Sequence, residues 1–293
     1  MAAVRTAKKL VLGQEIKHMI ETAGVTQAVA GSYIEIGQSK VSGLIRGEGS
    51  ITVGDLERLA TKLGFTDPNY IATLLELRRD NHKRGWWDTG YRRAYHEDIR
   101  LLVDVEGCAD RIRSAEVEIL PGLGQSRRYV EALHEGSGTE PGGPTFEDYV
   151  TARLARQEIF ERANPPEVHW VLSESCLRRM RCDAADMAEA IRYLVTLSKR
   201  PNVFVQVLPF NLVPGKRSPI GNRFTLLRLP SPGQAGPIEL AYTEGEGRIS
   251  YLDDKDALKA HDESWTRLSA AALDFVESRK FMEKVAEAFE EVA

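Results

Sequence analysis

The chain has 293 residues, of which 42% are hydrophobic and 28% charged. This is the composition of a globular protein with material for about two domains, and no run of about 18 apolar residues suggests a membrane span. The net charge of −4 argues against nonspecific binding to nucleic acid, but residues 1–85 hold 12 Lys and Arg against 9 Asp and Glu. A mildly basic N-terminal part followed by an acidic remainder fits a DNA-binding module joined to a part that does not touch DNA.

The cysteines and the N-terminus both favour a cytoplasmic protein. Cys108, Cys176 and Cys182 are an odd number without CxxC spacing, so we expect reduced thiols packed as small hydrophobic side chains. The opening residues, MAAVRTAKKLVLG, are partly basic but lack the apolar core and cleavage site of a signal peptide.

The first two predicted helices are short and close together. Apolar side chains recur at helical spacing over residues 10–22, and Gly24 is expected to end that helix. Thr26 is a natural N-cap for the second helix. The side chains expected to face inward on this second helix are Val29, Tyr33 and Ile34.

A third helix, predicted over residues 38–46, is the stretch best suited to DNA. Val41, Leu44 and Ile45 recur at i, i+3 and i+4 and form its inner face. The side chains left outward are Gln38, Ser39, Lys40, Ser42, Gly43 and Arg46. These are mostly short polar groups with a cation at the far end, which can approach base edges and neutralise phosphates.

Two more helices complete an all-α domain that we place over residues 1–80. Thr52 is expected to cap the fourth helix and Gly64 to end it, and Pro68 opens the fifth. The inward side chains predicted on the fourth helix are Val53, Leu56, Leu59, Ala60 and Leu63.

A polar and basic linker is predicted over residues 81–95. It contains Trp86 and Trp87, which are either a platform for stacking nucleic-acid bases or, as we favour, an anchor to the second domain.

Residues 96–293 predict a mixed α+β domain. The stretch 97–133 reads as mostly helical, and a charged helix is predicted over 146–162. A last helix is predicted from residue 257 to about 278, with a continuation toward 289. About five strands are expected, over residues 168–172, 203–208, 224–229, 238–242 and 249–252.

Signals of catalysis are poor, so we predict no enzyme, no catalytic residue, no metal and no cofactor. The six histidines form no HxH or HxxxH pair, and Ser173-Glu174-Ser175 lacks the G-x-S-x-G pattern and favours a helix cap. The acidic residues near the last two strands suggest either a divalent-cation site or, as we favour, solvated edge charges. They are Glu244, Glu246, Asp253 and Asp254.

Three pieces of residues 10–75 follow a known pattern: Thr26-Gln27, then the run Gln38 to Ser42, then Arg46-Gly47. This part resembles the lambda-repressor-like helix-turn-helix of XRE-type regulators. The resemblance implies that the second helix begins at a DNA phosphate and that the third reads base edges. It assigns the phosphate contact to Gln27, base edges to Gln38, Ser39 and Ser42, a base or the backbone to Lys40, and a phosphate to Arg46.

Two of these assignments also have support from the side chains themselves. Gln38 can make a bidentate contact to adenine, with a polar helix start as its alternative role. Arg46 has an alternative role as a cation at the C-terminus of the helix.

The sequence departs from the XRE pattern at four positions. Glu35 stands at the turn glycine, Gly37 at the usual Ser or Thr N-cap, and Gly43 at a long side chain that often reads a base. Gly31 stands where a packed alanine is common.

The rest of the chain holds separated pieces in a recognisable order: RGWW at 84–87, LPGLGQ at 120–125, residues 153–157, NVFVQVLPF at 202–210, and YLDD at 251–254. It is similar to the domain that follows the helix-turn-helix in actinobacterial regulators of the WhiJ-like, Scr1-type antitoxin-like class. That resemblance implies a transcription factor that dimerises. It also implies a small partner protein encoded by an adjacent gene, as in toxin–antitoxin pairs.

We therefore predict a sequence-specific transcriptional regulator that binds double-stranded DNA as a homodimer on an inverted repeat. Half-sites are expected about one helical turn apart, with recognition helices about 34 Å apart. The second domain is expected to carry dimerisation, a partner surface or a pocket for a small-molecule effector. The alternatives are an antitoxin-like protein whose main role is to bind a small partner, and an enzyme that the helix-turn-helix targets to DNA.

Overall fold

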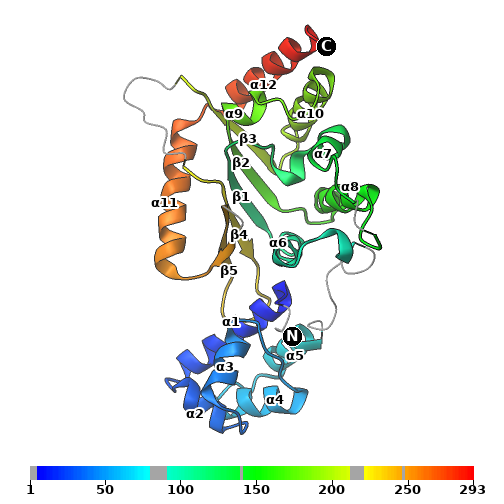
Figure 1. Cartoon of the computed structure of the whole chain (residues 1–293). Coiled ribbons are helices and arrows are strands. Elements are labelled where there is room, and N and C mark those ends of the chain that lie inside the picture. The colour runs from blue at the N-terminus through cyan, green and yellow to red at the C-terminus, as the bar shows by residue number, and fades with distance from the viewer. Residues whose placement is uncertain (1–4, 80–90, 139–140, 212–220, 246–247) are drawn as a thin grey trace. The chain divides into compact units, whose positions relative to one another are not determined.

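The computed structural model describes residues 5–79, 91–138, 141–211, 221–245 and 248–293. They divide into two compact units (Figure 1). The described residues of unit 1 are 5–79, 100–108 and 229–238, and unit 2 holds the others. No helix in these described ranges is long and apolar enough to cross a membrane.

Unit 1 contains the five predicted helices. They are α1 Ala7–Thr22, α2 Gln27–Ser32, α3 Gln38–Ile45, α4 Val53–Lys62 and α5 Pro68–Arg79. The predicted caps are confirmed, because the Thr26 hydroxyl accepts a hydrogen bond from the Val29 amide at 3.2 Å and Thr52 caps α4 in the same way. Gly24, just after α1, adopts a φ of 65°, which suits a residue that ends a helix.

Large apolar side chains from all five helices form the core of unit 1, with two corrections to the predicted inner faces. The core includes Ile16, Met19, Ala30, Val41, Leu44, Leu56, Leu59 and Leu74. Val29 and Val53, predicted to face inward, are 41% and 44% exposed. Ala30 and Ile34 form the buried side of α2, and Val53 is the first residue of α4, beyond the buried stripe that begins at Leu56.

Two later segments complete unit 1: most of α6 (Glu97–Glu106) and the loop at residues 230–237 that joins strands β4 and β5. The Ala7 amide at the start of α1 donates to the buried Asp104 carboxylate on α6 at 2.6 Å. Such a charge-assisted bond satisfies one of the free amides at a helix N-terminus.

The loop at 230–237 meets α1 at Glu15, a carboxylate with no exposed surface. Glu15 accepts hydrogen bonds from the Ser231 hydroxyl at 2.5 Å and from the backbone amides of Gln234 and Ala235 at 3.0 and 3.1 Å. The Tyr70 hydroxyl on α5 donates a further bond at 2.8 Å, and burial together with the Glu15 carboxylate raises the pKa of that hydroxyl. Every partner is a donor, which is what a buried carboxylate requires.

Unit 2 is built on one six-stranded sheet in the order β3-β2-β1-β4-β5-β6. The strands are β1 Arg111–Glu116, β2 Glu167–Ser173, β3 Val203–Leu208, β4 Phe224–Leu229, β5 Ile238–Gly245 and β6 Arg248–Leu252. β1, β2 and β3 are parallel, β4 runs antiparallel to β1, and β5 and β6 are antiparallel. The fold class predicted for this part, mixed α and β, is confirmed.

One of the six strands, β1, was not predicted. It lies in the stretch 97–133, which was predicted as mostly helical, so that part of the prediction is wrong. Its sequence is polar. Arg111 and Arg113 point to one face of the sheet, where they pair with Glu239 and Asp262 at 2.9 and 2.7 Å. On the other face, the Ser114 hydroxyl donates to buried Glu116 at 2.8 Å. A central strand with its charges paired by distant residues does not show the apolar alternation on which strand prediction depends.

Helices cover both faces of the sheet (Figure 1). On one side lies α11 Lys255–Ala271; on the other lie α7 Arg127–Leu133, α8 Phe146–Ala155 and α10 Ala184–Leu197. The remaining helices are α9 Glu174–Arg178 and α12 Phe275–Glu290, and α12 packs on α10 and β3. Short 3-10 helices are found at Arg92–Ala94, Gly122–Gly124 and Arg156–Glu161.

Two predicted helices are each divided in the structure. The charged helix over 146–162 is α8 followed by the 3-10 turn at Arg156–Glu161. The last helix is interrupted at Ala272, which is extended, and Asp274 then caps α12 by accepting from the Val276 and Glu277 amides. A capping aspartate inside a helical pattern marks a new helix start.

The remaining predictions have mixed outcomes. Cys176 is buried as expected, whereas Cys108 is exposed and so is not packed as a small hydrophobic side chain. Trp86 and Trp87, most of the predicted linker, and Glu246 lie outside the described residues.

Candidate nucleic-acid interface

The position of α3 depends on a close approach to α1. A Cβ atom on Gly13 of α1 would lie 2.3 Å from the Ile45 carbonyl oxygen and 2.7 Å from that of Leu44. Only glycine lets the last turn of α3 pack this closely. Val41 and Leu44, both buried, hold the same side of α3 on the core.

The turn between α2 and α3 explains two departures from the XRE pattern. Glu35 has a φ of 58°, the left-handed conformation for which glycine is the usual residue, and its side chain is exposed. Gly31 is needed because a Cβ atom there would lie 2.5 Å from the Ile36 carbonyl oxygen. The turn therefore keeps the backbone expected of the XRE pattern. Its left-handed position holds Glu35 in place of glycine, and a glycine, Gly31, is found instead within α2.

The first turn of α3 presents exposed polar side chains: Gln38, Ser39 and Lys40. The N-cap residue, Gly37, makes no side-chain hydrogen bond. The first amides of a helix have no partner within it, so this end of α3 carries donors suited to an anion such as a phosphate. Gln27, the predicted phosphate contact, is the first residue of α2 and is half-buried.

The other end of α3 is organised around Arg46. Its guanidinium donates to the Ser42 hydroxyl at 2.5 Å and to the Glu48 carboxylate at 2.8 and 2.9 Å. The Arg46 carbonyl oxygen accepts a bond from the Arg5 guanidinium at 3.0 Å. Arg46 and Glu48 remain 53% and 43% exposed, so the pair lies at the surface.

The ion pair with Glu48 was not anticipated from the sequence. The hydrogen bond from Arg46 holds the pKa of the Glu48 carboxyl below its usual 4.5, so Glu48 stays charged at neutral pH. A phosphate that approaches Arg46 must compete with this carboxylate. The sequence did hold a signal of this ion pair, because Glu48 follows Arg46 by only two residues.

The structure thus places five of the six predicted residues along the outer side of α3 and its C-cap, and the sixth at the start of the adjoining α2. None of the described residues forms a group of three or more His, Cys, Asp or Glu placed to hold a metal. Ser173 is the N-cap of α9, because its hydroxyl accepts a bond from the Ser175 amide at 3.2 Å.

Two short helices joined by a tight turn, with the polar side of the second exposed, define a helix-turn-helix DNA-binding regulator. In agreement, residues 11–73 match the family described as "Helix-turn-helix domain". Residues 99–284, more than half of the chain, match the family described as "Domain of unknown function (DUF5753)". The chain belongs to this DUF5753 family. Comparison with curated proteins found no match, and comparison with solved structures found none either.

Proposed function

We propose that this protein is a sequence-specific transcriptional regulator that inserts α3 into the major groove of its operator. The observation that carries the proposal is the exposed first turn of α3, where Gln38, Ser39 and Lys40 project from a helix whose other side is buried. In helix-turn-helix proteins the N-terminal residues of the second helix contact base edges.

Each polar residue has a proposed role. Gln38 reads a base, with adenine as the partner that a carboxamide can bind in bidentate fashion, and Ser39 contacts a neighbouring base edge. Lys40 and Ser42 contact bases or backbone, and Gln27 and Arg46 contact phosphates on either side of the groove.

We propose a homodimer on an inverted repeat, because α3 has only eight residues and a helix of this size reads only a few base pairs. The two copies of α3 would lie about 34 Å apart, one turn of B-DNA. We place the protein in the cytoplasm, where its DNA target is.

The proposed role of unit 2 is dimerisation and sensing, either of a small molecule or of a small partner protein of the kind found with WhiJ-like regulators. We propose no enzymatic reaction for it. Purification from the native organism followed by identification of stably bound proteins tests the partner. A small protein retained at equal stoichiometry would favour the antitoxin-like alternative.

The replacement Gln38→Ala tests the proposed base readout. Losing a bidentate contact is expected to weaken operator binding by about 1–3 kcal/mol per half-site in a gel-shift titration. Gln234→Ala is the matched control, because Gln234 is exposed in the β4–β5 loop of unit 1 and lies on neither α2 nor α3. Equal operator affinity for the two variants would mean that Gln38 does not read DNA.

A further inference from the structure

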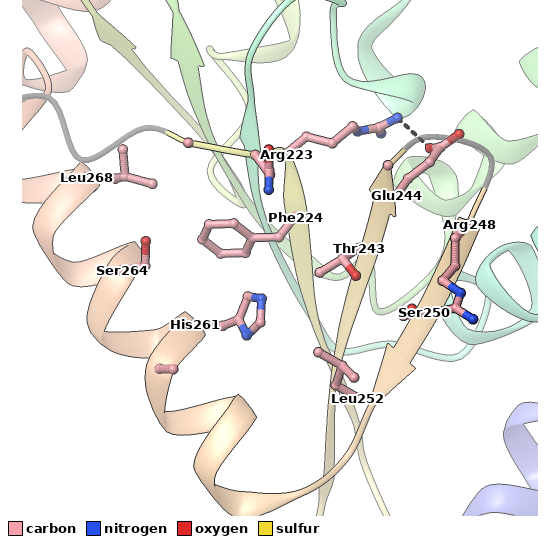
Figure 2. Close-up of a pocket in the computed structure, with 14 residues that line it drawn as sticks. Arg223, Phe224, Thr243, Glu244, Arg248, Ser250, Leu252, His261, Ser264 and Leu268 are labelled. Atoms are coloured by element: carbon pink, nitrogen blue, oxygen red, sulfur yellow. Dashed lines mark hydrogen bonds and ion pairs between the residues drawn. The ribbon is translucent and has the colours of Figure 1, made fainter.

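A cavity of about 550 Å³ lies in unit 2 between α11 and the strands β4, β5 and β6 (Figure 2). Next to it, α11 packs on the sheet through an apolar core that includes Trp265, Leu268 and Phe224. The cavity begins where this core ends. Its volume falls in the range of about 300–1,000 Å³ that is usual for sites that bind small molecules.

Several of the residues that line the cavity on β5 and β6 have small side chains. In the register of β5 and β6, Thr243 lies opposite Ser250 and Gly245 opposite Arg248. Because side chains alternate between the faces of a sheet, these four residues share one face. On α11, the facing residues are Ala260 and Ser264. These small residues on β5, β6 and α11 leave space between the strands and the helix.

The inner wall of the cavity is apolar. Figure 2 shows the Phe224 ring projecting from β4 toward α11 and the His261 ring projecting from α11 toward the strands. The two rings meet edge to face, with centroids 5.2 Å apart. Leu252 and Leu268 complete this wall, which therefore suits an apolar ligand body.

The polar groups of the cavity favour a ligand with one negative charge. Arg248 lines the cavity and is exposed, and its side chain makes no hydrogen bond or ion pair with any other residue that the structure describes. The Nδ1 atom of His261 lies 2.8 Å from the Ala257 carbonyl oxygen, which can only accept, so Nδ1 carries a proton and Nε2 remains for a ligand.

The other arginine of the cavity is already neutralised. Arg223 pairs with Glu116 at 3.3 Å and with Glu244 at 2.9 Å, and Glu244 also accepts a bond from the Tyr242 hydroxyl. Arg248 is thus the one lining cation without a carboxylate partner among the described residues. A single guanidinium matches one carboxylate, whereas a dianionic phosphate would keep an uncompensated charge near Glu244.

We propose that this cavity binds a small aromatic carboxylic acid, with its ring against Phe224 and Leu252 and its carboxylate at Arg248. The hydroxyls of Thr243, Ser250 and Ser264 supply further hydrogen-bonding groups along the cavity. The inference deepens the proposed sensing role of unit 2 and rests on it.

The test is a titration of the full-length chain, without DNA, with benzoate, 4-phenylbutanoate and naphthalene-2-carboxylate, followed by saturation-transfer NMR. The uncharged naphthalene-2-carboxamide is the matched control ligand. At least one acid should bind saturably, and the naphthalene acid should bind about tenfold more tightly than its amide because of the charged hydrogen bond.

Two variants locate the site. Arg248→Gln should bring the affinities of the naphthalene acid and amide to within about twofold of each other, and Ser264→Leu should abolish binding of both by filling the cavity. Arg267→Gln is the control, since Arg267 is exposed on α11 and does not line the cavity. The Arg248 variant changes only an exposed side chain, so it tests the site even if Ser264→Leu perturbs folding.

No saturable binding of any of the three acids would overturn the proposal, as would affinities that neither Arg248→Gln nor Ser264→Leu changes. Because the titration contains no DNA, its result is independent of the operator-binding test of Gln38. Failure of the cavity and failure of the regulator proposal can therefore be told apart.

Discussion

At the scale of single residues, the feature that most affects the proposed DNA contact is the pairing of Arg46 with Glu48. The two carry opposite charges at the end of α3, and the Nε and Nη2 atoms of Arg46 contact the same carboxylate oxygen of Glu48 at 2.9 and 2.8 Å. The proposed phosphate ligand is therefore held in place but also neutralised. We expect mild acidification not to release Arg46, because the hydrogen bond from Arg46 lowers the pKa of the Glu48 carboxyl.

Replacing Glu48 by Gln should strengthen operator binding, because Arg46 would no longer have to leave a carboxylate. An exposed pair contributes about 0.2–1 kcal/mol, so we expect a gain of up to about fivefold in a gel-shift titration. Arg46→Gln should weaken binding, and the double variant should bind no better than Arg46→Gln alone. If Glu48→Gln instead weakens binding, the carboxylate serves to orient Arg46 and not to compete with DNA.

The helix caps were predictable from sequence because their cause is local, whereas a buried polar group with distant partners was not. Thr26 and Thr52 were recognisable as caps because the amide that each binds lies three residues away. The sequence around Glu15 does not indicate that its carboxylate is buried, because one of its hydrogen-bond partners, Ser231, lies 216 positions further along the chain. The Arg46–Glu48 pair is local, and its geometry depends on the left-handed Gly47 between them.

At the scale of elements, α3 is positioned by contacts on only one of its sides. Gly13 has no room for a Cβ atom, whereas a Cβ atom on Gly43 of α3 would meet nothing within 4 Å. Glycine lowers the stability of a helix by a similar amount at both positions, but only Gly13 is tightly surrounded.

The pair Gly13→Ala and Gly43→Ala should therefore change stability in opposite directions. Gly13→Ala is expected to destabilise unit 1 by about 1–3 kcal/mol through overpacking against the Ile45 carbonyl. Gly43→Ala should stabilise α3 by about 1 kcal/mol, because alanine is the better helix former and has space. Native-state hydrogen exchange of the α3 amides in the full-length chain measures both. If Gly13→Ala leaves stability unchanged, α1 and α3 do not pack in close contact at Gly13.

The β4–β5 loop belongs to unit 1 because of Glu15, and a single substitution should release it. In Glu15→Gln the side-chain NH₂ would face the donors of Ser231, Gln234 and Tyr70, so at least one bond is lost. We expect a loss of about 1–3 kcal/mol, together with faster hydrogen exchange of the Gln234 and Ala235 amides.

The matched control for this substitution is Glu21→Gln on the same helix. Glu21 is 66% exposed and lies 4.0 Å from Lys17, so its replacement should change stability by less than about 0.5 kcal/mol. Equal effects of the two replacements would show that the buried network does not hold the loop.

At the scale of the whole molecule, strands β4 and β5 connect the two proposed functions through the chain itself. Phe224 at the start of β4 and Thr243 near the end of β5 line the cavity. The loop that joins the other ends of the same strands is bonded to Glu15 of α1. If a ligand displaced either strand along its length, the movement would reach the loop through the chain and α1 through the hydrogen bonds to Glu15.

Most of the fold was predictable, because helices α1 to α5 and five of the six strands of the sheet follow local signals of caps, turns and apolar periodicity. The exception on the sheet is β1, whose Arg111, Arg113 and Glu116 find their partners in residues more than 100 positions away or on neighbouring strands. The cavity had no sequence signal, because residues of three strands and one helix come together to line it only after folding.

The central claim is that the outer side of α3 reads DNA sequence, and selection of bound sites from random double-stranded DNA tests it most directly. For the full-length wild-type chain we predict an inverted repeat with half-site centres about one helical turn apart. For Gln38→Ala we predict the same spacing, with the preference lost at one symmetric base pair in each half-site. Identical base preferences for the two proteins, or no enriched sequence with the wild type, would contradict the account.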